Sequence, residues 1–359
     1  MGKKKSKKNL CILIALLLFK KNKAKSLKIS TFFRYPRTFL FVNIVLPLLK
    51  LYNLKEKVMI KQIVYISQSQ RLFTQNSQLL IADPKNGTVL KQMPIEELGF
   101  LVLDHAQIQI SMVAIEKLLT ENVALVFCNE KHLPIGLTLP LEANTLQNER
   151  FRAQIEASES LKKQLWKQVV EAKILNQAAL LEKWQSEKVA EKLLFLAKSV
   201  KSGDAQNAEA QAARLYWQHI FLPYCPDFVR ERFGLPPNHL LNYGYTLLRA
   251  AMARALVGAG LLPTLGIFHH NRYNAYCLAD DMMEAYRPWV DDWVCQKVAH
   301  NDFESELKTE HKKAALEVLF ADVKLGKETK PLMLALSATA ASLQKCFEGT
   351  VKKLSLPKW

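Results

Sequence analysis

The alternation of apolar and polar residues divides the chain near residue 144. Before that point, short apolar or alternating runs rich in Ile, Leu and Val are typical of β-strands. Strands are predicted at 60–66, 78–82, 99–103, 107–110, 123–128 and 135–139, with one helix at 112–120. A turn is predicted at 84–87, because its Asn-Gly pair tolerates positive φ.

The pattern after residue 144 favours helices. Residues 148–200 contain no Gly or Pro and combine many charges with periodic apolar positions, which predicts long helices. Ser202-Gly203-Asp204 breaks them, and Asp204 is a candidate N-cap for the next helix. Prolines at 223, 226, 236 and 237 bracket a loop, and the helical pattern resumes from Leu240. The prediction is an α+β protein with a small N-terminal β domain (59–144) followed by a larger all-α domain (145–359).

Residues 1–58 form a basic and apolar extension. Its apolar runs, 9–19 and 39–49, are too short to span a bilayer. Basic residues beside apolar runs suit an anionic membrane surface, so a peripheral anchor is one interpretation. The favoured interpretation is that the native protein starts at Met59, directly before a strand pattern, and that 1–58 is non-native or disordered. A membrane location is therefore not expected.

The formal net charge of +17 belongs mostly to this extension. Residues 1–58 hold 15 Lys and Arg against one acid, which leaves the other 301 residues with a net charge of only +3. A DNA-binding surface in the main body must then come from local clustering of bases. The six cysteines are scattered without metal-knuckle or redox spacing, which indicates reduced thiols in a cytoplasmic protein.

Two segments of the helical region carry candidate metal ligands. Glu209 has Ala212, Ala213 and Tyr216 on its own helix face, where another helix can approach closely. An exposed first-turn Glu favoured by the helix dipole explains the same pattern about as well. His269 and His270 follow an apolar stretch, and adjacent positions rarely point the same way, so one of the two is the candidate.

The third candidate is an acidic helix face. On a helix at 275–286, Asp280, Asp281 and Glu284 fall opposite the apolar residues, with Asp281 and Glu284 at i, i+3. A solvated acidic surface is the commoner meaning of such a pattern. Like charges this close repel, however, unless a cation or base offsets them.

The most apolar helix, 243–260, carries Arg249, which should pair with an acid or a phosphate. The sequence contains no Gly-rich phosphate loop, nucleophile elbow or Cys-based zinc spacing.

At these residues the chain resembles the CRISPR-associated adaptation integrases, the Cas-one family, in their type II form. Four ordered blocks carry the resemblance: AEAQAARLYW at 208–217, LNYGYTLLR at 241–249, GIFHH at 266–270 and LADDMME at 278–284. It extends from about Met59 to the C-terminal region and leaves 1–58 unmatched, and it implies the β-plus-α fold that the pattern predicts.

The resemblance also implies a site and an activity. Glu209, His269 and Glu284 are the expected metal ligands and catalytic residues, with His269 preferred over His270 because the family histidine follows a Gly-apolar-apolar step. Asp281 is the expected auxiliary acid. Mn²⁺ or Mg²⁺ is the expected cofactor, and a His ligand favours Mn²⁺. Arg214, Arg249 and Arg272 are predicted DNA contacts.

The implied function is a metal-dependent DNA endonuclease and integrase that inserts spacer DNA into a CRISPR array by attack of a 3′-hydroxyl on a phosphodiester. The implied partners are double-stranded DNA (prespacer and repeat), a second copy of the chain joined through the β domain, and a small CRISPR-associated partner dimer that bridges two such dimers. Two alternatives stay open: a non-catalytic DNA-binding scaffold of the same complex, and a membrane-attached protein motivated by 1–58 alone.

Overall fold

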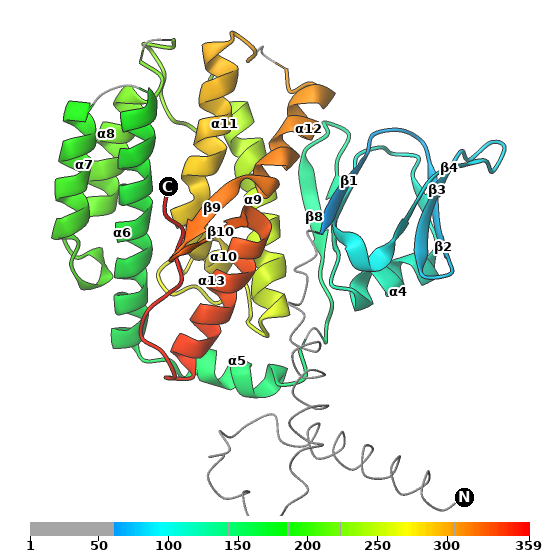
Figure 1. Ribbon diagram of the computed structural model, residues 1–359, viewed down its shortest axis with the longest axis horizontal. Helices are drawn as coiled ribbons and strands as arrows, with labels where there is room; N and C mark the ends of the chain where they lie inside the picture. Colours follow the sequence, from blue (N-terminus) through cyan, green and yellow to red (C-terminus); the bar gives the residue numbers. More distant parts are fainter. Residues whose placement is uncertain (1–60, 143, 185–186, 223, 304–305) are drawn as a thin grey trace, which may run out of the picture. The chain divides into compact units, whose positions relative to one another are not determined.

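The computed structural model describes residues 61–359 except 143, 185–186, 223 and 304–305 (Figure 1). The expectations for 1–58 therefore lie outside the described residues. Met59–Trp359 forms one compact unit. Across the described part, no helix combines the length and apolar character needed to cross a membrane.

The first sheet of the β region has the strand order β1-β5-β7-β8. Its strands are β1 (Gln62–Ile66), β5 (Leu98–Leu103), β7 (Ala124–Cys128) and β8 (Pro134–Thr138). β1, β5 and β7 run parallel, and β8 pairs antiparallel with β7. All six residues of β5 are buried, as expected for a parallel strand covered on both faces. The four strands predicted here are confirmed within two residues.

The second sheet has the order β4-β3-β2-β6. Its strands are β2 (Arg71–Gln75), β3 (Gln78–Ala82), β4 (Val89–Pro94) and β6 (Gln109–Ile110). The predicted turn joins β3 to β4, and Gly87 adopts φ +73° in it. The sequence did not predict β2 or β4. β4 buries little more than Met93, so its residues lack the apolar alternation that reveals a strand.

Helix α4 (Met112–Thr120) has the predicted bounds. The Ser111 hydroxyl caps it by accepting a hydrogen bond from the Ala114 N–H at 3.2 Å. The helix buries Ala114 and Leu118 in a core that the β region makes for itself.

Nine helices of the described part follow (Figure 1). They are α5 (Gln147–Ile155), α6 (Glu159–Trp184), α7 (Glu187–Ser199), α8 (Ala208–His219), α9 (Asn238–Gly258), α10 (Cys277–Met283), α11 (Arg287–Ala299), α12 (Thr309–Glu317) and α13 (Leu332–Phe347). Helices α5, α6 and α7 confirm the prediction of long helices between 148 and 200 for the residues that the structure describes there. α9 is the central helix, because it contacts α10, α11, α12 and α13.

The α+β class is confirmed, but the C-terminal region is not purely α. A hairpin of β9 (Asp322–Leu325) and β10 (Glu328–Pro331) lies between α12 and α13. Val323 is its one fully buried apolar residue, so the charged positions hide the strand alternation in the sequence. Gly326 supplies the positive φ, +64°, that its turn requires.

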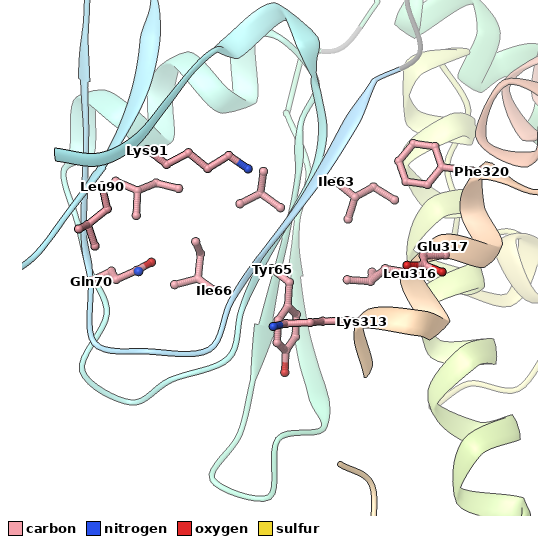
Figure 2. A pocket seen from close by; sticks show the side chains of 12 residues that line it. Ile63, Tyr65, Ile66, Gln70, Leu90, Lys91, Lys313, Leu316, Glu317 and Phe320 are labelled. Carbon is pink, nitrogen blue, oxygen red and sulfur yellow. The ribbon is translucent and has the colours of Figure 1, made fainter. Parts of the chain in front are cut away.

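The sheet and the helices share a core. Phe100, Val102, Ala124 and Val126 from one face of β5 and β7 belong to the large helical core, while Leu101 and Leu103 belong to the core of the β region. A cavity of about 400 Å³ lies beside this junction, lined by residues of β1, β4 and α12 that include Tyr65, Lys91 and Lys313 (Figure 2). None of the predicted site residues lines this cavity.

Candidate metal centre

Glu209 lies in the first turn of α8, where the preceding loop fixes the start of the helix. The Asp204 carboxylate accepts hydrogen bonds from the backbone N–H groups of Ala208 at 2.8 Å and Glu209 at 3.0 Å. The Asp204 side chain therefore pairs with the first N–H groups of α8, but the N-cap residue is Asn207, in a left-handed conformation, so the N-cap was predicted three residues too early. The Glu209 side chain is only 21% exposed, so the interpretation as an exposed first-turn glutamate is wrong.

The acidic residues of α10 and the short 3-10 turn after it (Glu284–Tyr286) are buried. Asp281 is 0% exposed, Glu284 5% and Asp280 8%. A solvated acidic surface is therefore also the wrong interpretation of this pattern. Buried carboxylates need partners, and each of the three has a different one.

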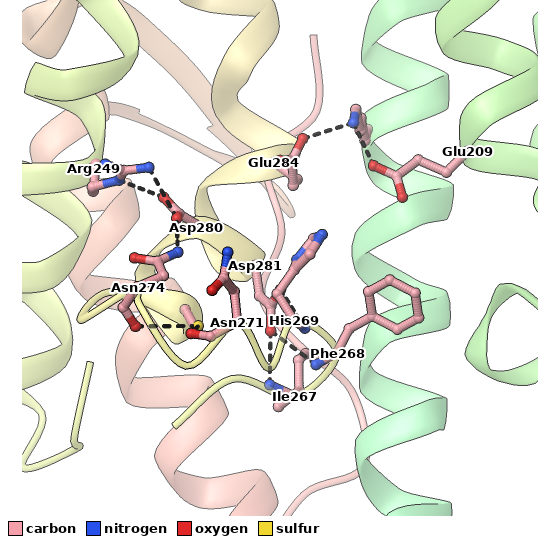
Figure 3. A network of polar contacts seen from close by, with 12 residues as sticks. Glu209, Arg249, Ile267, Phe268, His269, Asn271, Asn274, Asp280, Asp281 and Glu284 are labelled. Atoms are coloured by element: carbon pink, nitrogen blue, oxygen red, sulfur yellow. Dashed lines mark hydrogen bonds and ion pairs between the residues drawn. The ribbon is translucent and has the colours of Figure 1, made fainter. Parts of the chain in front are cut away.

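Asp281 holds the loop that carries His269. Its Oδ2 accepts hydrogen bonds from the backbone N–H groups of Ile267 at 2.7 Å and Phe268 at 2.9 Å, and its Oδ1 lies 2.5 Å from His269 Nδ1 (Figure 3). The loop can approach this closely because residue 266 is glycine. A Cβ there would lie 2.3 Å from the His269 carbonyl oxygen and 2.9 Å from Asp281 Oδ2.

His269 is oriented by this contact, and His270 is not. The His269 ring packs edge-on against the ring of Trp166 with 5.5 Å between centroids. Its side chain is 45% exposed and His270 is exposed too, so the contact with Asp281 distinguishes the two histidines, and burial does not. The hydrogen bond to Asp281 raises the pKa of His269 above its usual value against the effect of burial, and the nearby charges of Glu284 and Glu209 raise it further. With Nδ1 engaged by Asp281, Nε2 is the nitrogen available to a ligand.

The side chains of Glu209 and Glu284 point toward each other from opposite sides (Figure 3). Both contact one cation, the ammonium of Lys173 on α6. Lys173 Nζ lies 2.6 Å from Glu209 Oε1 and 2.7 Å from Glu284 Oε2. Burial disfavours the charge on Lys173, but Glu284 and Glu209 outweigh it, so the pKa of Lys173 lies above its usual value. Glu209 Oε1 and Glu284 Oε2 therefore lie close to each other, because both contact the same nitrogen atom.

The second oxygen of Glu284 has a cation of its own. Arg287 Nη2 lies 2.7 Å from Glu284 Oε1. Burial raises the pKa of Glu284, but Arg287 and then Lys173 outweigh it and bring the pKa of Glu284 below its usual value. Glu284 is therefore ionised at neutral pH.

The donor set fits a divalent cation. Glu209, His269 and Glu284 supply two carboxylate oxygens and an imidazole nitrogen, the mixture that Mn²⁺ accepts and Mg²⁺ tolerates less well. Glu284 Oε2 is buried and, despite its short distance to Lys173, has no hydrogen-bond partner among the described residues. As they lie here, no three His, Cys, Asp or Glu side chains of the described part are close enough together to hold an ion.

Sequence reasoning missed three residues of this site: Lys173, Arg287 and Trp166. Lys173 had a readable signal, because α6 buries Trp166, Val169, Val170, Lys173 and Ile174 at helical spacing, and a lysine inside an apolar stripe requires an anion. Arg287 lies at i+3 from Glu284, which is the spacing of an ion pair on a helix. Trp166, whose ring stacks on Phe268 with centroids 4.4 Å apart, had no signal beyond its apolar position.

The predicted DNA contacts lie in three different settings. Arg249 is paired with Asp280, at 2.5 Å from Nε to Oδ1 and 3.0 Å from Nη2 to Oδ2, yet its side chain remains 41% exposed. Arg214 on α8 is exposed. Arg272 is exposed three residues after His269 and lies over the ring of Tyr273, 4.6 Å from its centroid.

Comparison with known sequences identifies relatives along most of the chain. The family model described as "CRISPR associated protein Cas1" matches residues 64–322. The CRISPR-associated endonuclease Cas1 of Neisseria meningitidis serogroup C (strain 8013) is 33% identical over 298 residues, which cover 82% of this chain and 94% of that protein.

Comparison with solved structures finds the same fold. A casposase bound to integration product has a TM-score of 0.66 at 20% identity, covering 82% of this chain and 92% of that one. A chain of a Cas6-RT-Cas1–Cas2 complex has a TM-score of 0.65 at 20% identity, covering 84% of this chain and 36% of that one.

Proposed function

This chain belongs to the Cas1 family of CRISPR-associated proteins, and from that membership we propose that it is a divalent-metal-dependent DNA endonuclease and integrase. It inserts spacer DNA into a CRISPR array through attack of a 3′-hydroxyl on a phosphodiester. One observation carries the proposal: a half-buried carboxylate from α8 and a buried one from the turn after α10 meet at a single cation, beside a histidine that a third carboxylate orients.

In this proposal Glu209, Glu284 and Nε2 of His269 hold Mn²⁺ or Mg²⁺. When bound, the ion supplies Lewis acidity to the reacting phosphate and lowers the pKa of the attacking hydroxyl. Asp281 touches neither DNA nor ion; it holds His269 through Nδ1 and the loop through Ile267 and Phe268. A carboxylate behind a ligating histidine fixes its tautomer and ring orientation.

Cationic side chains around the site suit a polyanionic substrate. Arg287 remains beside Glu284, and the half-exposed Arg249 and exposed Arg272 lie on the elements that flank the acidic helix. We propose that Arg214, Arg249 and Arg272 contact DNA phosphates. Because the net charge outside residues 1–58 is small, local clusters of basic side chains such as this one would have to supply DNA binding.

The test is strand transfer of a labelled duplex into an array by the Glu209→Ala variant. We expect at least a hundredfold loss with DNA binding retained, because the alanine removes a metal ligand and no DNA contact. Glu171→Ala is the matched control, since Glu171 pairs with Lys167 on the surface of α6 and leaves the site intact. Retained strand transfer in Glu209→Ala would refute the site assignment.

A non-catalytic DNA-binding scaffold is the alternative. Its acids would only balance Lys173 and Arg287, and it would need no metal. Calorimetric titration of the full chain with Mn²⁺ separates the two functions. Saturable binding that Glu209→Ala abolishes supports the enzyme, and the absence of any binding supports the scaffold.

We propose the partners that the solved neighbours contain, together with a second copy of this chain. The casposase is bound to its integration product and the second neighbour is part of a Cas6-RT-Cas1–Cas2 complex, which supports DNA and a Cas2-like protein as partners here. In the β region Leu90, Met112 and Ile135 are 57%, 75% and 69% exposed, which supports a homodimer interface there. Sedimentation of the full chain and of a Leu90→Glu variant tests the dimer.

A cytoplasmic location accompanies this function. The five cysteines of the described part are all free, which fits a reducing compartment. The type II assignment also remains a prediction.

A further inference from the structure

We propose that Lys173 is an internal counter-cation: its ammonium occupies the metal position in the metal-free protein, and a divalent ion displaces it. The inference rests on the proposed function, because it concerns the same metal site. It means that a residue of α6 that is not itself a metal ligand sets the affinity of the site for the ion.

The geometry places the ammonium where an ion would bind. Lys173 Nζ contacts one oxygen of Glu209 at 2.6 Å and one of Glu284 at 2.7 Å, from a side chain that is 10% exposed. Hard divalent cations bind carboxylate oxygens at roughly 2.0–2.6 Å, so ammonium and ion compete for the same oxygens. Glu284 Oε2, which accepts no hydrogen bond within the described part, keeps its lone pairs for an ion.

Arg287 cannot take the place of Lys173. Its guanidinium is engaged at the other oxygen of Glu284, Oε1, and lies over the ring of Tyr245, 4.6 Å from the ring centroid. Without Lys173, the Glu209 carboxylate and Glu284 Oε2 would face each other with no cation between them. Two close carboxylates in a buried site destabilise the fold, so the metal-free protein needs the ammonium.

Lys173 and a divalent ion exclude each other from this position. Cations a few ångströms apart in a poorly hydrated site repel strongly, and the ammonium of Lys173 already contacts Glu209 Oε1 and Glu284 Oε2. The lysine has a flexible four-carbon stem, so the ammonium can leave while the backbone of α6 stays in place. Metal binding therefore includes the free energy of removing Lys173 from its two carboxylates, which weakens the apparent affinity for the ion.

The test is the Lys173→Met variant of the full chain, stripped of metal and titrated with Mn²⁺ by calorimetry at a fixed neutral pH. Methionine replaces the four-carbon stem by an unbranched apolar chain of the same number of atoms and removes the competing ammonium. We expect Mn²⁺ to bind at least tenfold more tightly than to the wild type, about 1.4 kcal/mol. We also expect a lower melting temperature without metal and a larger increase on adding Mn²⁺.

Equal or weaker Mn²⁺ affinity in Lys173→Met would overturn the proposal, because a lysine that stays beside the ion, or lies outside the site, gives that result. Should this variant fail to fold without metal, Lys173→Gln supplies the same comparison with a neutral polar side chain. Lys183→Met is the matched control on the same helix. It removes a lysine paired with Asp292 and should leave Mn²⁺ affinity unchanged.

The wild type and Glu209→Ala separate this inference from the proposed function. Wild-type binding that Glu209→Ala abolishes, without enhancement by Lys173→Met, refutes the role of Lys173 alone. The absence of Mn²⁺ binding in all variants refutes the metal site and, with it, the counter-cation.

Discussion

Buried carboxylates in the helical region differ in what holds them, and the partner decides their charge. Glu284 lies between two cations and is ionised, whereas the direct side-chain partners of Asp291 on α11 within the described residues are two tyrosine hydroxyls. Asp291 Oδ2 accepts a hydrogen bond from Tyr216 at 2.8 Å, and Oδ1 accepts one from Tyr245. Burial raises the pKa of Asp291 from 3.8 to about 6, against the effect of both hydrogen bonds.

This carboxyl makes stability depend on pH. Because the pKa of Asp291 is higher in the folded state than in the unfolded chain, its stabilising contribution is complete below pH 3.8 and is lost as pH rises through about 6. The variant Asp291→Asn carries an amide at this position, which does not titrate. The free energy of unfolding of the wild type relative to the variant should therefore fall by about 1 kcal/mol from pH 5 to pH 7.5.

Urea denaturation of both proteins at the two pH values measures this difference. Protonation of all other groups cancels in the comparison, provided both proteins keep the same fold. A difference that stays constant, or that grows with pH, would show that Asp291 is ionised in the folded protein throughout this range.

At the scale of elements, the sequence was informative where burial is one-sided. The helices of 148–200 and the helix at 112–120 were predicted because their apolar residues recur with the helical period. The strand at 78–82 was predicted because it is a short run of apolar residues, four of which are buried. β4 and the β9–β10 hairpin were not, since few of their residues are buried. The pattern of apolar residues indicates which side of an element is buried. An edge strand with few buried residues, such as β4, therefore lacks a recognisable pattern.

The candidate site shows the same limit. Glu209, His269 and Glu284 could be selected from their surroundings and from the family resemblance, but the contact that Glu209 and Glu284 share with Lys173 could not. That contact joins α6, α8 and the turn after α10, which are distant in sequence. A pairing of this kind is a property of tertiary packing, and no spacing along the chain encodes it.

The C-terminal segment after α13 helps to set the position of α6. Asn176, buried one turn after Lys173, donates hydrogen bonds to the carbonyl oxygens of Ala285 at 2.9 Å and Pro357 at 3.2 Å. Its own carbonyl oxygen accepts a hydrogen bond from the Trp359 N–H at 3.0 Å. One side chain therefore ties α6 both to the turn that carries Glu284 and to the end of the chain.

The Asn176→Ala variant should lose about 2–4 kcal/mol of stability, because it leaves buried backbone groups without partners. Urea denaturation measures the loss, and Gln164→Ala on the exposed side of α6 is the control with an expected change under about 0.5 kcal/mol. If Asn176→Ala were as stable as the control, water would have to replace all three hydrogen bonds.

At the scale of the whole described fold, the β region and the helices are joined by a buried ion pair as well as by the shared core. Lys312 on α12 is 3% exposed and places its Nζ 3.3 Å from Oδ2 of Asp104, the residue after β5. Asp104 also accepts a hydrogen bond from Tyr65 and lies 2.8 Å from His132 Nδ1. Removing one partner of a buried pair leaves the other charge uncompensated.

The Lys312→Met variant should therefore be less stable by about 3 kcal/mol, at the lower end of the range for a broken buried ion pair. The loss is not larger because Tyr65 and His132 still contact the Asp104 carboxylate in the variant. Lys313→Met is the matched control: the neighbouring lysine is exposed and lines the cavity beside the junction (Figure 2), so its loss should change stability by less than about 0.5 kcal/mol.

Two probes reveal whether the pair couples the regions. All six tryptophans lie between Trp166 and Trp359, so their fluorescence reports the helical region alone, whereas circular dichroism reports both regions. Because Phe100, Val102, Ala124 and Val126 are buried among the helices, we expect the two transitions to coincide in the wild type and to shift together in Lys312→Met. An earlier loss of the circular dichroism signal, with tryptophan fluorescence unchanged, would mean that the shared apolar core is too weak to hold the sheet and that the ion pair is the main connection.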